Sequence, residues 1–229
     1  MGQIADLYTA GRHTLLDLAA ALTPEDEAAF VPATPQWTVK DVYAHLTGVV
    51  ADALGGRMDG VATDPWTARQ VAERADRSLT DICAEWAELG PELEEALRAF
   101  PDLANPRLII DQWTHEQDIR AALGKPGSRT DGRMTFCVDV MLTGFSKGWA
   151  ETDLPCVVVT GDSGAWPLGE GEVGTRLTAT DFELARAVMG RRSRAQVLAL
   201  RWSPRDEARI GPVVDHLHAF PHADVDLLE

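Results

Sequence analysis

The sequence predicts a helical domain followed by a smaller α+β domain, and three observations support this division. Apolar residues recur at helical spacing through roughly the first 150 residues. A β-branched run, residues 156–160, then changes the pattern to that of strands and glycine-rich turns. With 229 residues, 45% of them apolar, the chain is long enough to bury a core in each part. We therefore expect a helical bundle over residues 1–152 and an α+β domain over residues 153–229.

Caps and breakers mark the helices of the first part. Pro32 and Pro35 interrupt the chain, and Thr38 with Asp41 resembles a capping box that begins a new helix. Gly56 lies at the end of that helix, where glycine is favoured. We expect helices over residues 3–22, 38–56, 67–75, 78–100, 107–123 and 134–150, and a short helix that begins at residue 23. The last of these is expected to complete an antiparallel bundle.

The second part shows strand and turn signals before its helices. The β-branched run at 156–160 is followed by a glycine-rich turn, so we expect a hairpin with residues 165–168. A third strand is expected near 175–180. Helices are expected over 181–189, 194–200 and 211–220.

Composition excludes several classes of function. The chain carries 36 acidic and 21 basic residues, a net charge of −15, and is a poor candidate for binding nucleic acid or anionic membranes. No apolar run reaches the ~20 residues of a membrane span, and the first residues do not read as a signal peptide. Three scattered cysteines without a CxxC motif fit a reducing compartment. We expect a cytoplasmic protein, monomeric or homodimeric.

The histidines indicate a candidate metal site. Asp111, His115 and Asp118 follow the spacing i, i+4 and i+7, which places them on one face of a helix. A second histidine, His45, lies within another expected helix. Two histidines and a carboxylate leave a coordination position open, as in catalytic zinc sites. Taken alone, an Asp-x-x-x-His pair is more often a solvated ion pair or a capped core histidine.

Three segments resemble the mycothiol-dependent maleylpyruvate isomerase family of the DinB-like superfamily. The first is Pro35-Gln-Trp-Thr-Val-Lys-Asp-Val-Tyr-Ala-His45-Leu-Thr-Gly48, similar to the family's W-T-V-x-D-V-x-x-H-L-x-G element. The second, Asp111-x-x-x-His115-x-x-Asp118-Ile, is similar to its E-x-x-x-H-x-x-D-I element. The third combines Thr160-Gly-Asp-Ser-Gly-x-Trp166 with Gly190-Arg-Arg-Ser193 and resembles its C-terminal domain.

The resemblance implies a DinB-like up-down-down-up four-helix bundle followed by a sterol-carrier-like α+β domain. It also implies a divalent metal, usually zinc, held by His, Glu and His, with the thiol of mycothiol bound as a thiolate. Metal coordination deprotonates a thiol and so makes it a nucleophile. His45 and His115 match the two histidine ligands. Asp111 takes the place of the glutamate and is one methylene shorter.

Further roles follow for four residues. Asp118 is expected to orient a ligating histidine, with a surface ion pair as the alternative. Trp113, close to the ligand face, is assigned to cosubstrate binding, with core packing as the alternative. The family places a functional arginine in its second domain, and Arg191 or Arg192 best fits that role, gripping a substrate carboxylate or enolate.

These features predict a zinc- and mycothiol-dependent isomerase or thiol S-transferase that acts on a small electrophile. Substrates that bear a carboxylate are included in this expectation. Maleylpyruvate is the substrate in the family's name, but we rank a generic mycothiol-dependent role above it. The alternative is a non-catalytic protein that binds an apolar small molecule or lipid and has a degenerate metal site. A third possibility is hydrolysis by a metal-bound water.

Overall fold

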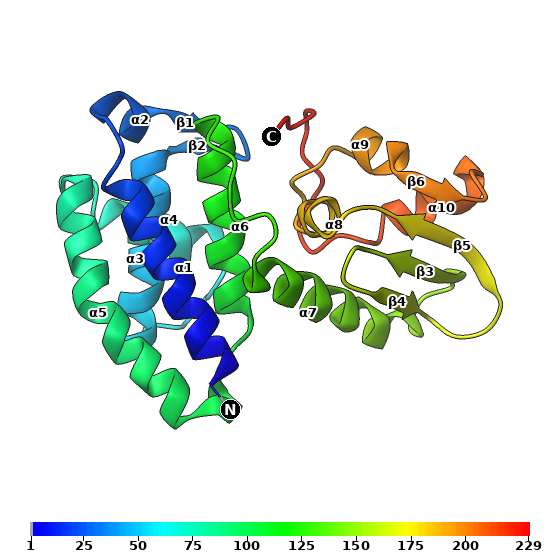
Figure 1. Cartoon of the computed structure of the whole chain (residues 1–229), viewed down its shortest axis with the longest axis horizontal. Helices are drawn as coiled ribbons and strands as arrows, with labels where there is room; N and C mark the ends of the chain where they lie inside the picture. Colours follow the sequence, from blue (N-terminus) through cyan, green and yellow to red (C-terminus); the bar gives the residue numbers. More distant parts are fainter. Residues whose placement is uncertain (1) are drawn as a thin grey trace. The chain divides into compact units, whose positions relative to one another are not determined.

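A computed structural model describes residues 2–229 of the chain (Figure 1). The chain folds into two compact units that divide after Gly127. The first is helical and the second mixes helices with a small sheet, which confirms the predicted fold class at this level. Each unit is described by itself below.

Four helices form the bundle of the first unit: α1 (Gln3–Ala19), α3 (Val39–Gly55), α5 (Leu79–Ala99) and α6 (Arg107–Ala122). α1 and α3 each pack against both α5 and α6. Arg98 near the end of α5 pairs with Asp6 near the start of α1, so these two helices are antiparallel. Lys40 at the start of α3 donates to the carbonyl oxygen of Arg77, just before α5, so α3 and α5 run in the same direction. Figure 1 shows α1 and α6 running one way and α3 and α5 the other.

Shorter elements complete the first unit. The short helix α2 (Pro24–Ala28) begins at a capping box formed by Thr23 and Asp26. α4 (Asp64–Ala72) packs on α3, and the 3-10 turn η1 (Pro101–Leu103) follows α5. β1 (Phe30–Val31) and β2 (Thr34–Thr38) form a small antiparallel hairpin where only a break in the chain was expected. Proline is tolerated here because the pair of strands has open edges.

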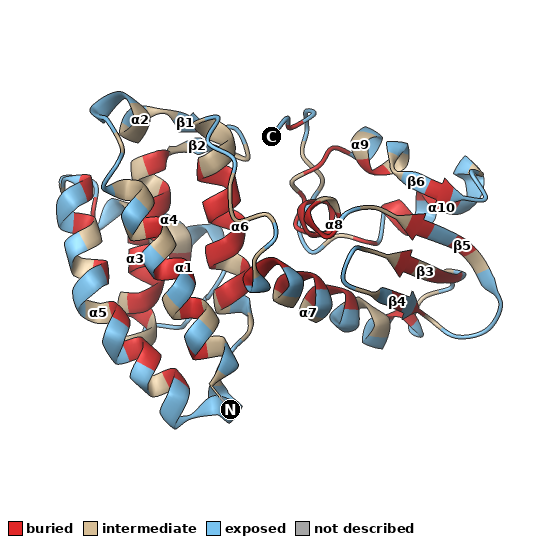
Figure 2. Cartoon of the chain, viewed as in Figure 1, coloured by how far each residue is buried: buried red, intermediate tan, exposed pale blue. Residues whose placement is uncertain are grey.

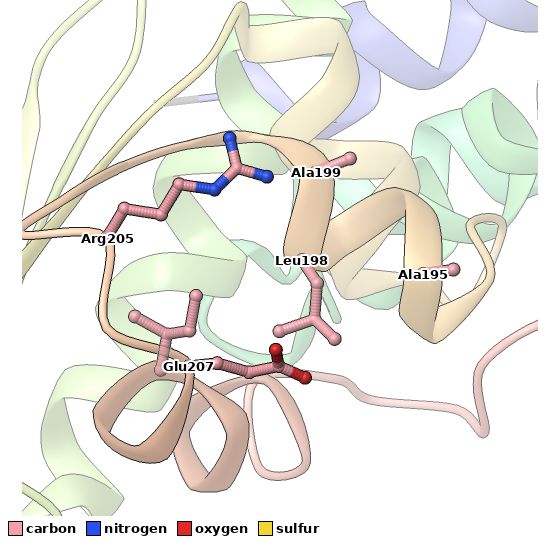
Figure 3. Close-up of a pocket in the computed structure, with 6 residues that line it drawn as sticks. Ala195, Leu198, Ala199, Arg205 and Glu207 are labelled. Atoms are coloured by element: carbon pink, nitrogen blue, oxygen red, sulfur yellow. The ribbon is translucent and has the colours of Figure 1, made fainter.

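Burial is uneven among the bundle helices. Eleven of 17 residues of α3 and ten of 16 of α6 are buried, against five of 17 in α1. Figure 2 shows the buried stretches of α3 and α6 within the bundle. The centre of the first unit therefore lies along α3 and α6.

The second unit contains a four-stranded sheet in the order β4-β3-β5-β6. Its strands are β3 (Cys156–Thr160), β4 (Ala165–Leu168), β5 (Val173–Thr178) and β6 (Arg201–Ser203). β3 pairs antiparallel with β4, as the expected hairpin requires, and parallel with β5. β6, which the sequence did not predict, pairs antiparallel with β5. The helices α8 (Asp181–Val188), α9 (Arg194–Ala199) and α10 (Glu207–Val214) complete the unit.

The helix α7 (Gly132–Trp149) departs from the expected bundle. It was predicted to be the bundle's last helix, but it packs on β4 and α8 within the second unit. The division therefore falls after Gly127, whereas the sequence placed the boundary at residue 152. The physical reason is that an amphipathic helix specifies an apolar face and not the partner that covers it.

Candidate metal centre

The polar interior of α6 marks a candidate site inside the bundle. Six of its buried residues are polar or charged: Gln112, Thr114, His115, Glu116, Gln117 and Asp118. Polar groups are expensive to bury unless they are hydrogen-bonded or bind a charged ligand. A helix that buries this many polar groups at the centre of a fold therefore indicates that some of them form hydrogen bonds or bind a ligand rather than only pack the core.

The spacing of α6 brings the predicted side chains together on one face. Nε2 of His115 lies 3.6 Å from Oδ1 of Asp111, one turn earlier. Its other ring nitrogen, Nδ1, lies 3.2 Å from Oδ2 of Asp118. The imidazole is thus placed between two carboxylates along a single helix, which the i, i+4, i+7 pattern requires.

His45 comes from α3, whose start is fixed by a capping box. The hydroxyl of Thr38 accepts from the backbone N–H of Asp41, and the carboxylate of Asp41 accepts from the backbone N–H of Thr38. This fixed start places His45 near the middle of α3, facing α6. Nε2 of His45 lies 3.6 Å from Oδ2 of Asp111, and the rings of His45 and His115 are 5.1 Å apart between centroids.

The distances between these atoms fit a single metal ion. His45, Asp111 and His115 each offer one ligand atom, and the three atoms lie within 4.8 Å of one another. Ligands at about 2.0–2.1 Å from a tetrahedral zinc ion lie roughly 3.3 Å apart. Oδ2 of Asp111 lies 3.6 Å from Nε2 of His45, and its other oxygen, Oδ1, lies 3.6 Å from Nε2 of His115, so each imidazole has one carboxylate oxygen near this distance. Although its side chain is one methylene shorter than that of glutamate, Asp111 reaches both imidazoles because each of its two oxygens faces one of them. The residues present therefore fit the ion that the resemblance implies.

Exposure of the three side chains is asymmetric. The side chains of His45 and His115 are 3% and 9% exposed, whereas that of Asp111 is 35% exposed. Buried imidazoles held near a carboxylate that reaches solvent leave one side of the group accessible. Such a side is where a thiol or substrate would have to enter.

Two tryptophans flank the imidazoles. The ring of Trp37, at the end of β2, lies 5.1 Å from that of His45 and 6.0 Å from that of His115. Trp66, at the start of α4, meets His45 edge-on at 6.3 Å. From the sequence alone, Trp37 was assigned no role of its own at the site. The signal that could have marked it is its place directly before the capping threonine of α3.

Gln70 is a neighbour of His45 that the sequence analysis missed. Its Oε1 lies 2.8 Å from Nδ1 of His45, and its Nε2 donates to Oδ2 of Asp52 at 2.7 Å. Asp52 is fully buried and is also held by Arg57 and Arg69. No local pattern could reveal this chain of contacts, because Gln70 lies 25 residues after His45 on another helix.

Asp118 is fully buried beside His115. The alternative role, a surface carboxylate paired with a basic residue, therefore does not describe this side chain. A carboxylate on the second ring nitrogen of a histidine is the usual arrangement behind a ligating imidazole.

The structure places the remaining predicted site residues differently. Trp113 is fully buried, so its indole presents no surface to a cosubstrate and lies in the core. In the second unit, the guanidinium of Arg192 is buried and donates two hydrogen bonds of 2.8 Å to Glu183. Arg191 is half-buried and donates to the carbonyl oxygen of Met189 at 2.9 Å.

Two of the three cysteines of this chain are poorly suited to act as a nucleophile. Burial raises the pKa of the Cys83 thiol to about 12. Burial also raises the pKa of Cys137 well above its ordinary value. Thiols that stay protonated at neutral pH are weak nucleophiles and weak metal ligands. The candidate centre itself consists of two histidines and an aspartate and includes no cysteine.

The C-terminal histidines do not form a comparable group. His216 stacks edge-on against Trp149, with 5.3 Å between ring centroids. The rings of His218 and His222 lie 4.7 Å apart, and Nε2 of each donates to a backbone carbonyl oxygen, that of Asp215 and that of Val214 respectively. Among residues 2–229, the group of three possible ligands is the one formed by His45, Asp111 and His115.

The four-helix bundle and the two histidines and carboxylate inside it define a helical-bundle protein with a candidate metal centre. The chain belongs to the family described as mycothiol maleylpyruvate isomerase N-terminal domain, whose sequence model matches residues 8–123. That range covers α3, α5 and α6 completely and α1 from Tyr8 onward, and it includes every residue of the candidate centre. The family name points to a mycothiol-dependent class of enzyme.

No significant match was found among curated proteins or among solved structures. Over the residues that the structure describes, no helix combines the length and apolar character needed to cross a membrane.

Proposed function

We propose that the protein is a zinc-dependent enzyme that uses mycothiol as a cosubstrate. The reaction is either an isomerisation or a transfer of the thiol to a small electrophile, and a carboxylate-bearing electrophile is the first substrate class to test. The observation that carries the proposal is the convergence of His45, Asp111 and His115 on one point inside a bundle of the mycothiol maleylpyruvate isomerase family. The three free cysteines fit the reducing cytoplasm, where we place the reaction.

The chain's residues have distinct parts in this proposal. His45 and His115 would hold the ion through Nε2, and Asp111 through a carboxylate oxygen. When bound, zinc supplies the positive charge that keeps a coordinated thiol deprotonated at neutral pH. Trp37 covers one side of the imidazoles and limits the access of water to them. Asp118 fixes the orientation of His115 from behind.

The functional arginine that the resemblance implies, Arg191 or Arg192, would bind the substrate carboxylate. Both lie on the loop after α8, and Arg191, the more exposed of the two, is the first to test. A guanidinium suits a carboxylate because it offers two parallel N–H donors.

One assay tests the proposal and its rivals. Zinc is added to the purified protein, excess metal is removed, and metal content is measured before turnover of an electrophile is followed with and without mycothiol. About one zinc per chain and turnover only with mycothiol are expected. Turnover without mycothiol would point to metal-assisted hydrolysis. A chain that retains no zinc would favour the binding protein with a degenerate site.

The product distinguishes the two reactions. An isomerase returns a product of the same mass as the substrate and regenerates the thiol. A transferase leaves an adduct that contains the thiol. Mass spectrometry of the products therefore decides between them, and replacing Arg191 by Gln should raise KM for a carboxylate-bearing electrophile more than for a neutral one.

A further inference from the structure

The side chain of Gln70 occupies a space behind His45 that exists only because residue 48 is glycine. Gly48 lies three residues after His45 on α3, on the side that α4 covers. A Cβ atom at Gly48 would lie 2.5 Å from Cβ and 2.7 Å from Cγ of Gln70. Contacts that short do not occur between real side chains, so an alanine there would displace Gln70. The H-L-x-G pattern at His45–Gly48 therefore places an amide against the imidazole.

Asp52 determines which way the amide of Gln70 points. Asp52 has no exposed side-chain surface and holds Arg57 and Arg69 at 2.8 and 2.9 Å, which requires it to be a carboxylate. A carboxylate accepts hydrogen bonds and donates none. The amide nitrogen of Gln70 must therefore face Asp52, where its Nε2 lies 2.7 Å from Oδ2. The amide oxygen consequently faces His45.

The amide oxygen in turn determines where the proton of His45 lies. Oε1 of Gln70 is 2.8 Å from Nδ1 of His45, and an amide oxygen is an acceptor only. Nδ1 therefore carries the hydrogen. A neutral imidazole has one N–H, so its lone pair lies on Nε2, the nitrogen that faces Asp111.

We propose that Gln70 is a positioning residue that holds His45 as the Nδ1–H tautomer, with the lone pair of Nε2 directed at the candidate metal centre. Asp52 and its two arginines fix Gln70 in that orientation, and Gly48 admits it. The tautomer follows from these contacts alone. The statement that Nε2 then ligates zinc rests on the proposed function.

The two histidines thus have different groups at Nδ1. The carboxylate of Asp118 lies 3.2 Å from Nδ1 of His115 without hydrogen-bond geometry, whereas Nδ1 of His45 donates to a neutral amide whose own N–H donates to Asp52. The amide gives His45 the same orientation without a second negative charge next to its ring. Groups of this kind commonly decide the tautomer and orientation of ligating histidines.

The test is an NMR spectrum of the metal-free full-length protein labelled with ¹⁵N-histidine, recorded at about pH 8, where an ordinary imidazole is neutral. Long-range ¹H–¹⁵N correlations identify the protonated nitrogen, and the His45 signals are assigned by their loss in His45→Gln. The wild type is expected to show the Nδ1–H tautomer. Gln70→Leu should lose that preference, and its zinc affinity should fall by roughly 10–100-fold in competition with a chromophoric chelator.

Two further variants separate positioning from general damage to the fold. The control, Gln196→Leu, removes a half-buried glutamine of the second unit, one that donates to the carbonyl oxygen of Leu227 and has no contact with either imidazole in the contacts described. It should keep both the tautomer and the zinc affinity. The exchange Gln70→Glu with Asp52→Asn restores an acceptor facing Nδ1 with its donor behind it. This double variant should regain the Nδ1–H signal.

The outcomes distinguish this proposal from the proposed function. An Nε2–H wild type, or an Nδ1–H signal that persists in Gln70→Leu, overturns the role of Gln70. If Gln70→Leu does not fold, the wild-type spectrum and the double variant still decide the question. An Nδ1–H wild type that binds no zinc supports the role of Gln70 and overturns the metal-dependent function instead.

Discussion

Two buried groups of ionisable residues, one in each unit of the molecule, are arranged in opposite ways. In the second unit, the buried guanidinium groups of Arg186 and Arg192 face the carboxylates of Glu183 and Glu229, so opposite charges close on each other. In the first unit, His45, Asp111 and His115 face one another with lone-pair atoms. In the first arrangement, each charge is neutralised by an opposite charge within the cluster. The second arrangement is stabilised most when it binds a cation.

This difference separates a stabilising cluster from a binding cluster. Breaking one side of a buried ion pair is costly because the remaining charge stays buried without a partner. Lone-pair atoms gathered around one point contribute little to folding, and their value lies in what they bind. Substitutions in the buried ion pairs of the second unit should therefore change stability, and substitutions in the candidate centre of the first unit should change metal binding.

The largest effect is expected from Asp111→Ala. It leaves two histidines and an ion with too few ligands, so most of the metal should be lost on dialysis against a mild chelator. The free energy of unfolding of the metal-free protein should change little, because this side chain is partly exposed. Asp111→Glu restores the residue implied by the family resemblance and should retain metal, and Asp6→Ala serves as an exposed control. Metal content per chain is the measurement, and wild-type content in Asp111→Ala would remove Asp111 from the ligand set.

Arg186→Met should have the largest effect on stability. The side chains of Arg186 and Glu229 are both almost fully buried, and removing one partner of such a pair costs about 3–5 kcal/mol. Urea unfolding of the metal-free protein measures this loss, and zinc affinity should remain that of the wild type. The matched control is Arg194→Met, whose ion pair with Asp215 is exposed and should therefore contribute much less to stability. Equal losses for the two variants would contradict a stabilising role for the buried cluster.

Asp118→Ala should have an intermediate effect. It removes the carboxylate behind His115 but none of the three ligands, so zinc affinity should fall by roughly 10–100-fold rather than vanish. The measurement is competition with a chromophoric chelator, with Asp111→Ala run alongside. If Asp118→Ala lost the metal and Asp111→Ala kept it, the two aspartates would have each other's roles.

The smallest effect is expected from Glu183→Gln, and it should depend on pH. Hydrogen bonds from Arg192 hold the pKa of Glu183 below its ordinary value of 4.5. A carboxyl group with a lowered pKa contributes stability that is fully present above its unfolded pKa and is lost as pH falls through the folded one. The stability difference between wild type and Glu183→Gln should therefore shrink as the pH falls below about 4.5. Arg192→Gln should abolish the same trend, and a difference that is constant with pH would exclude this ion pair as its source.

Local patterns were sufficient for the parts of the site that lie on one helix. The relation of Asp111, His115 and Asp118 follows from helix geometry once α6 is predicted, and the capping box at Thr38 and Asp41 fixes the start of α3. Pairing His45 with that face required the family resemblance, because no local rule brings two helices together.

Long-range packing decided the rest. Gln70 and Asp52 reach His45 only through the contact of α4 with α3, which no periodicity encodes. The same limit explains the placement of α7, whose apolar face suits a bundle or a sheet equally well. The hairpin of β1 and β2 was missed because its strands are very short and one contains Pro35, a residue typical of breaks.

The one-sided exposure of the candidate centre has a consequence for rates. Both imidazoles are almost inaccessible, whereas the carboxylate of Asp111 is partly exposed, so Asp111 is the member of the group that solvent reaches most. In the zinc-bound protein that we propose, water could replace an oxygen of this carboxylate while the buried imidazoles stay in place. The lifetime of a bound ion should then depend more on residue 111 than on either histidine.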